Sequence, residues 1–321
     1  MRWLRILRLP ELLEQFQAHM VSQLDLTKEA HNLEEFRRNF GRRKSRRDAG
    51  EIAFPAPLAV LPAGRAGGEG DGAKWVAAKG GVLVESREEG VGLDRWLVKE
   101  SDALRSRAGK RRRDPAAEEA ARERREKIAI NAATAFFQMV LLDNFVHADL
   151  HPGNILLREP KRKGRADAEQ PTAIVFLDAG LVVRLSERDK RNFADLFLAV
   201  AKGEGKRAGQ LIVSRSPGGR EGVRRNGGDP DRFVRAIAAV VEEVAAKKFQ
   251  LGAVAIGPVL LDVLSAVRED CVPLEPAFGN LVSAIIVLEG IGRQLHPDLD
   301  LFALAVPMLV KQAARRAAGR G

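Results

Sequence analysis

Hydrophobic residues along the chain follow two patterns, one with helical spacing and one of short continuous runs. Residues 11–40 show helical spacing, with Leu26, Leu33 and Phe36 on one face and Asp25 positioned to cap the second part. The runs that predict strands are 52–55, 58–61, 81–86, 155–157 and 174–177. Helices are predicted later, at 187–213, 230–249, 255–272, 277–294 and 299–317, with a glycine- and arginine-rich loop at 215–229. The second half of the chain is therefore expected to be mainly helical.

A polar loop lies between the apolar run at 135–142 and the predicted strand at 155–157. It reads His-Ala-Asp-Leu-His-Pro-Gly-Asn from His147 to Asn154. The order His-x-Asp-Leu-x-x-x-Asn matches the catalytic loop of protein-kinase-like phosphotransferases, where the aspartate meets the attacking hydroxyl and the asparagine holds magnesium. Asp149 and His147 are therefore candidate catalytic residues. His147 and His151 could instead be structural, hydrogen-bonding histidines.

The predicted strand at 174–177 ends in Asp178-Ala179-Gly180, which is where kinases carry a second magnesium ligand. Asn154 and Asp178 are therefore candidate metal ligands, since magnesium prefers oxygen donors. The alternative for Asp178 is a turn residue that closes a strand. A zinc site is not expected, because Cys271 is the chain's single cysteine and the histidine spacing fits no such site.

Two glutamates are candidate residues for binding ATP. Glu29 lies on the apolar stripe of its predicted helix, where a carboxylate must find a cation or strong donors. Kinase-like folds place such a carboxylate beside the ATP-binding lysine, although an edge glutamate facing solvent is the alternative. Glu85 lies near the end of the predicted strand at 81–86, which would lead into the hinge. Lys79 is not expected to be the ATP lysine, because it follows Glu29 instead of preceding it.

Composition limits the classes of function. Of the 321 residues, 45% are hydrophobic, as in ordinary globular proteins, and the net charge is +10. The basic runs at 42–47 and 110–113 lack interleaved aromatic residues, so nucleic-acid binding is not indicated. They are either solvated loops or a surface that associates peripherally with an anionic membrane. No apolar run is long enough for a transmembrane helix, and the first residues form no clear targeting peptide.

Two segments are predicted to be insertions. Residues 101–126 are almost wholly charged residues and alanine, and their first half is expected to be disordered. Residues 158–171 are expected to form an extended hairpin tip. Between Asp178 and the helix start at Ser186 there is no room for the segment on which protein kinases dock peptides. A small-molecule or lipid substrate is therefore expected in preference to a protein.

Several motifs together resemble the aarF-domain, or UbiB-like, atypical kinases linked to ubiquinone biosynthesis. They are Gln23 to Asn32, Val82 to Glu85, His147 to Asn154, Leu177 to Gly180, and Leu288-Glu289-Gly290 with Arg293 and Pro297. Most of the family has phenylalanine where this chain has Ala179. In this respect the chain resembles the mitochondrial branch called aarF-domain-containing kinase two. The resemblance implies ATP and magnesium as cofactors, a quinone-precursor substrate, and a mitochondrial or plastid location. The family's ATP-binding lysine segment is not found, so an N-terminal truncation is expected.

We predict an α+β, protein-kinase-like, two-lobed fold. Residues 1–100 would form an incomplete small N-lobe, residues 101–126 a charged insertion, and residues 127–321 a mainly helical C-lobe. The predicted function is an atypical ATP-dependent kinase or ATPase, with Mg-dependent phosphoryl transfer supporting quinone or lipid metabolism. The alternative is a catalytically inactive pseudokinase scaffold that binds a membrane surface or a partner protein.

Overall fold

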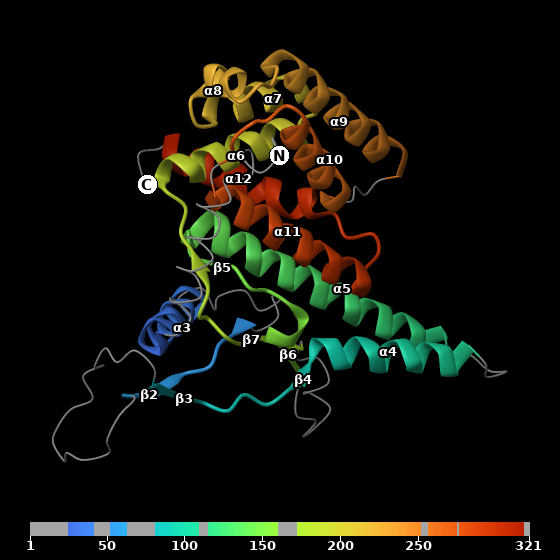
Figure 1. Ribbon diagram of the computed structural model, residues 1–321. Coiled ribbons are helices and arrows are strands. Elements are labelled where there is room, and N and C mark those ends of the chain that lie inside the picture. Colours follow the sequence, from blue (N-terminus) through green and yellow to red (C-terminus); the bar gives the residue numbers. More distant parts are fainter. Residues whose placement is uncertain are drawn as a thin grey trace. The chain divides into compact units, whose positions relative to one another are not determined.

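The computed structural model describes residues 25–41, 52–62, 81–108, 115–159, 172–251, 256–274 and 276–317 (Figure 1). These residues form two compact units. The sheet unit contains residues 25–131 and 149–182, and the helical unit contains residues 132–148 and 183–317, in each case as far as they are described. Within the described residues, no helix has the length and apolar character needed to cross a membrane.

The sheet unit combines short strands with helices. Its helices are α3 (Leu26–Gly41), α4 (Leu93–Ala108), the first part of α5 (Pro115–Phe137) and the 3-10 turn Pro152–Asn154. Its strands are β1 (Ile52–Ala53), β2 (Pro57–Pro62), β3 (Gly81–Glu85), β4 (Val91–Gly92), β6 (Ile155–Arg158) and β7 (Ala173–Phe176). The main sheet has the order β1-β7-β6-β4, and β2 pairs with β3 separately.

The antiparallel pair of β6 and β7 forms the centre of the main sheet. Ile155 lies opposite Phe176, and Arg158 lies opposite Ala173. All four residues of β7 are buried, so other parts of the protein cover both faces of this strand. This pairing confirms the two strands predicted from the apolar runs. Of the hairpin tip expected at 158–171, residues 160–171 lie outside the described part.

Aromatic stacking fixes α3 on this sheet. The Phe36 ring of α3 stacks on Phe54 with 4.7 Å between centroids, and Phe54 contacts Phe176 of β7 at 5.6 Å. Arg37 donates a hydrogen bond of 2.8 Å to the carbonyl oxygen of Phe54. Such ring pairs contribute about 1 kcal/mol each beyond the area that they bury. The helix that carries Glu29 is therefore held rigidly against the strand that precedes Asp178.

The helical unit contains most of the remaining chain. It begins with the end of α5, a π-helical turn (Gln138–Asp143) and β5 (Val146–His147). After β8 (Val182–Val183), which lies at the boundary between the units, come α6 (Glu187–Ala201), α7 (Gly205–Arg215), α8 (Gly219–Arg225), α9 (Pro230–Leu251), α10 (Ile256–Glu269), α11 (Pro276–Leu295) and α12 (Leu301–Ala317).

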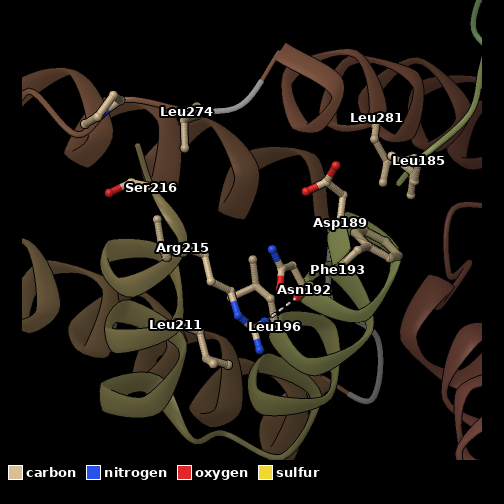
Figure 2. Close-up of a pocket in the computed structure, with 12 residues that line it drawn as sticks. Leu185, Asp189, Asn192, Phe193, Leu196, Leu211, Arg215, Ser216, Leu274 and Leu281 are labelled. Carbon is tan, nitrogen blue, oxygen red and sulfur yellow. Dashed lines mark hydrogen bonds between the residues drawn. The ribbon is translucent and has the colours of Figure 1, made fainter. Parts of the chain in front are cut away.

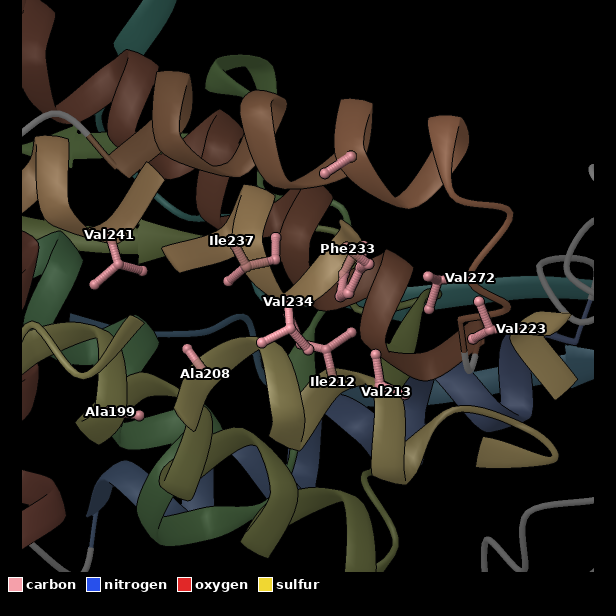
Figure 3. Packing of buried hydrophobic residues seen from close by; sticks show 11 residues of the cluster. Ala199, Ala208, Ile212, Val213, Val223, Phe233, Val234, Ile237, Val241 and Val272 are labelled. Atoms are coloured by element: carbon pink, nitrogen blue, oxygen red, sulfur yellow. The ribbon is translucent and has the colours of Figure 1, made fainter. Parts of the chain in front are cut away.

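A cluster of buried aliphatic and aromatic side chains holds α6 to α10 together (Figure 3). Phe233 and Val223 are fully buried in it. Close packing of α7 on α9 depends on two glycines, because a Cβ on Gly205 or Gly209 would lie within 3 Å of the α9 backbone. Their small size allows the two helices to approach more closely than larger residues would permit.

The structure differs from the predicted elements in three places. The predicted helix at 187–213 is two helices, because Gly203 adopts the left-handed conformation (φ 74°) that ends α6. The expected loop at 215–229 contains α8, which the burial of Val223 stabilises despite poor local propensity. Residues 101–108 continue α4, contrary to the expected disorder. The segment with Lys79 and both basic runs lie outside the described residues.

Both predicted N-caps are confirmed. The Asp25 carboxylate accepts a hydrogen bond of 3.1 Å from the Thr27 N–H, and the Ser186 hydroxyl oxygen accepts one of 3.0 Å from the Asp189 N–H. These side chains satisfy amide groups that have no partner inside the first turn of a helix. The helix starts could be read from sequence because the caps act locally.

A buried carboxylate joins α10 to α11. Glu289 is 3% exposed, and its carboxylate accepts hydrogen bonds from the backbone N–H groups of Ile256 and Gly257 at the start of α10. Arg293 donates to the same carboxylate at 3.1 Å and to the Pro297 carbonyl oxygen at 2.7 Å. The negative charge lies at the positive end of the α10 dipole and is neutralised by a guanidinium.

We expect Glu289→Gln to lower the free energy of unfolding by about 3 kcal/mol, because an amide donor would face N–H groups and Arg293 would lose its counter-charge. Urea denaturation followed by circular dichroism measures this. The matched control is Glu242→Gln at an exposed position of α9, where the change should stay below about 0.5 kcal/mol. Equal effects of the two substitutions would show that the Glu289 contacts contribute nothing.

Candidate functional site

The loop after β5 places Asp149 and Asn154 against each other. The Asn154 side-chain nitrogen donates to the Asp149 carbonyl oxygen at 3.1 Å and approaches the carboxylate oxygen Oδ2 at 3.4 Å. Asn154 is buried, whereas the Asp149 side chain is 40% exposed. Because the amide nitrogen faces Asp149, the amide oxygen is the end of Asn154 that points elsewhere and can bind a cation.

A short 3-10 turn fixes the shape of this loop. The His151 ring nitrogen Nδ1 accepts a hydrogen bond of 3.1 Å from the Gly153 N–H, and the Asn154 N–H donates to the His151 carbonyl oxygen at 2.9 Å. A Cβ on Gly153 would lie 2.8 Å from the His151 ring. Pro152 begins the turn, which suits its fixed φ. The sequence His-Pro-Gly-Asn therefore encodes the turn locally.

The β6–β7 register brings Asp178 to the same end of the two paired strands as Asn154. The Leu177 N–H donates to the Asn154 carbonyl oxygen at 2.8 Å, which continues the strand pairing by one step. Asp178 has the left-handed φ of 49°, and its carboxylate oxygen Oδ1 accepts a hydrogen bond of 3.1 Å from the Gly180 N–H. A non-glycine residue with this backbone conformation is uncommon and is often found at functional sites.

Asn32 of α3 holds the Asp178-Ala179-Gly180 turn in place. Its side-chain nitrogen donates to the Ala179 carbonyl oxygen at 2.8 Å, and both residues are buried. Sequence reasoning gave Asn32 no role in the site, although it lies one helical turn after Glu29 on the same helix. The available signal was an asparagine amid the apolar positions of α3, where a buried amide needs a partner.

Glu29 lies beside Asp178 in an acidic environment. Burial, followed by the charges of Asp178 and Glu85, raises the pKa of Glu29 to about 7, while the Ala179 N–H favours the charged form. Burial and the charges of Asp178 and Glu88 also raise the pKa of Glu85. The structure thus brings Glu29, Glu85 and Asp178 close to one another. Within the described residues, no Lys or Arg forms an ion pair with Glu29, so a bound cation would relieve the repulsion.

The donor set fits a magnesium ion that is shared with a nucleotide. Asp178 offers a carboxylate and Asn154 an amide oxygen, and both are hard oxygen ligands. Within the described part of the chain, no cluster of three or more His, Cys, Asp or Glu side chains could hold a metal alone. Magnesium usually binds through one or two carboxylates together with substrate phosphates and water, in agreement with this sparse set.

The two histidines of the loop have different surroundings. His147 belongs to β5 in the helical unit and is fully buried (0% exposed), which favours the structural alternative over a catalytic role. The His151 side chain is 52% exposed, and its Nε2 lies 3.9 Å from the Asp149 carboxylate. At that distance the two groups interact electrostatically without a direct hydrogen bond.

Comparison with known proteins yields a matching family model and several relatives. Residues 106–212 match the model of the ABC1 atypical kinase-like domain. The mitochondrial ABC1 family protein YPL109C of Saccharomyces cerevisiae is 30% identical over 99% of this chain and 47% of its own length. The probable protein kinase UbiB of Pasteurella multocida is 34% identical over 57% of this chain and 32% of its own length.

A solved structure shows the same fold. The complex of Rv3197 with erythromycin, from Mycobacterium tuberculosis, matches with a TM-score of 0.51 at 14% identity, over 92% of this chain and 61% of that one. The fold of the present chain is therefore mixed α+β, mostly helical and kinase-like, as predicted.

The mitochondrial ABC1 family protein C21C3.03 of Schizosaccharomyces pombe is 30% identical over 96% of this chain and 42% of its own length. The chain thus spans about half the length of the full-length relatives that it matches. The chain belongs to the ABC1/UbiB family of atypical kinases.

Proposed function

We propose that this chain performs magnesium-dependent phosphoryl transfer from ATP, or ATP hydrolysis. The observation that carries the proposal is the β6–β7 register. It brings Asn154 and Asp178 to the same end of two paired strands, and Asp149 lies against Asn154. Asp149, Asn154 and Asp178 have the residue types and the order that this chemistry needs.

Each residue has a separate role in this proposal. Asp149 orients the attacking hydroxyl or water and accepts its proton through a partly exposed carboxylate. Asn154 and Asp178 hold the magnesium ion, which neutralises charge on the phosphates when it is bound. Asn32 positions Asp178 by fixing the carbonyl group of the next residue. Glu29 and Glu85 face the nucleotide side, where Glu29 would pair with a cation.

We further propose a small-molecule or lipid acceptor, with a quinone precursor as the first choice, and a mitochondrial location. Only seven residues separate Asp178 from the Ser186 cap of α6, which supports the absence of a peptide-docking segment here. The two fungal relatives are mitochondrial by name, and this supports the location.

A pseudokinase scaffold is the second candidate. The observation that favours it is the acidic environment of Glu29, whose pKa is raised to about 7 and which has no ion-pair partner among the described residues, whereas kinases pair such a carboxylate with a lysine. A scaffold would not need to bind Mg-ATP, whereas a kinase or ATPase must bind it. Binding of Mg-ATP therefore separates the two functions.

We expect Asp178→Asn to reduce magnesium-dependent ATP turnover about 100-fold or more, because a neutral amide replaces the carboxylate ligand. The thermal stabilisation by Mg-ATP should disappear as well. Steady-state ATP hydrolysis and differential scanning fluorimetry measure the two effects. The control is Asp102→Asn at an exposed position of α4, which should leave both unchanged. Turnover that survives in Asp178→Asn would remove the magnesium assignment, and a wild-type protein without a Mg-ATP shift would favour the scaffold.

Asn32→Ala tests the positioning of the Asp178 turn. We expect the magnesium concentration for half-maximal turnover to rise about tenfold, as is typical when the residue supporting a metal ligand is removed. Magnesium titrations at saturating ATP measure this, with Arg38→Ala, at an exposed position of α3, as the control. A general loss of activity without any change in magnesium requirement would indicate a structural role alone.

A further inference from the structure

The helical unit contains a pocket between α6, α7 and the segment that joins α10 to α11. Most of its lining is hydrophobic, and its polar lining residues are Asp189, Asn192, Arg215 and Ser216. Figure 2 shows Asn192 on α6 facing Arg215 at the end of α7, with Leu274 and Leu281 on other walls. The pocket is therefore amphipathic, with polar groups gathered on two neighbouring helices.

Most of these polar groups already have partners inside the protein. Arg215 donates to the Asp195 carboxylate at 2.6 Å and to the Asn192 carbonyl oxygen at 3.0 Å. The Asp189 carboxylate accepts a hydrogen bond of 2.6 Å from the Ser186 hydroxyl, and the Ser216 hydroxyl donates to the Val213 carbonyl oxygen at 2.8 Å. Among the described residues, no group hydrogen-bonds the side-chain amide of Asn192. This amide can therefore contact a ligand in the pocket.

The charges around Asn192 select against a charged ligand of either sign. Arg215 is neutralised by Asp195, and Asp189 adds a further carboxylate to the lining. Arg188, whose guanidinium donates to the Arg215 carbonyl oxygen at 3.5 Å, adds a second positive charge, so two guanidiniums balance two carboxylates here. A charged head group of either sign would lose its hydration without gaining an unpaired counter-ion, which disfavours binding in a partly desolvated site. An amide offers both a donor and an acceptor, which suits a hydroxyl or carbonyl group.

A second, apolar pocket shares three lining residues with the first. Phe193, Leu196 and Ile212 line both pockets, and the second is otherwise lined by hydrophobic residues such as Val263 and Phe302. Its lining contains no charged residue. A hydrocarbon chain that lies along these three shared residues would contact apolar side chains, which is favourable.

We infer that the helical unit binds an uncharged single-chain amphiphile, with its hydroxyl or carbonyl head at Asn192 and its tail along Phe193 and Leu196 towards the second pocket. Such a site has the usual composition of small-molecule sites, a hydrophobic lining with few polar groups. The inference goes beyond the proposed phosphoryl transfer and does not depend on it, because it uses residues of the helical unit alone.

Three ligands with equal tails test the preference for an uncharged head. Decanol, decanoate and decylammonium are titrated into the full chain by isothermal titration calorimetry, below their aggregation concentrations. We expect saturable binding of decanol with one site per chain and at least tenfold weaker binding of decanoate and of decylammonium, because neither charged head finds an unpaired counter-ion near Asn192. The absence of saturable decanol binding, or equal or tighter binding of either charged ligand, would overturn the inference.

Two kinds of variant test the location. Leu211→Trp fills the first pocket and should weaken decanol binding at least tenfold, and Leu274→Trp on another wall should act in the same way if the first variant does not fold. Asn192→Leu should weaken it about fivefold, which corresponds to one hydrogen bond. The control is Leu261→Trp at an exposed position of α10 outside both linings. Unchanged affinity in the folded pocket variants, or an equal loss in the control, would contradict this location.

Discussion

The antiparallel pairing of β6 with β7 is the constraint on which the candidate site depends. One step beyond the register of Ile155 with Phe176, the Leu177 N–H bonds the Asn154 carbonyl oxygen. This places the two proposed magnesium ligands at the same end of adjacent strands. A shift of one residue would turn every side chain of β7 to the opposite face and would break the contact of Phe176 with Phe54, which opposes such a shift.

Packing and hydrogen bonding from α3 complete the arrangement. The stack of Phe36 on Phe54 and the contact of Phe54 with Phe176 fix the helix on the sheet. Asn32 then holds the carbonyl group of the residue after Asp178, and Glu29 approaches Asp178 itself. The same helix therefore supplies rigidity, a positioning hydrogen bond and negative charge. The repulsion among Glu29, Glu85 and Asp178 is tolerable if a cation binds there, since functional sites often keep such unfavourable electrostatics.

The sequence predicted those parts of the structure whose causes are local. Apolar runs predicted β6 and β7, and the caps at Asp25 and Ser186 marked two helix starts, because each signal lies within a few residues. The contact between Asn32 and Ala179 joins residues 147 positions apart, so no local pattern could predict it. The break at Gly203 was missed because the apolar spacing continues across it. The burial of His147 likewise depends on surroundings that the motif alone does not specify.

Replacing magnesium with paramagnetic Mn²⁺ tests the central claim most directly, because its effect on nuclear relaxation depends on distance from the metal. The account predicts that Mn²⁺ with ATP broadens the amide resonances of Asn154, Asp178 and Gly180, and that ATP without the metal does not. Asp178→Asn should remove this broadening. Unaffected resonances for these three residues in the presence of saturating Mn²⁺ and ATP would contradict a metal–phosphate site at the end of β6 and β7.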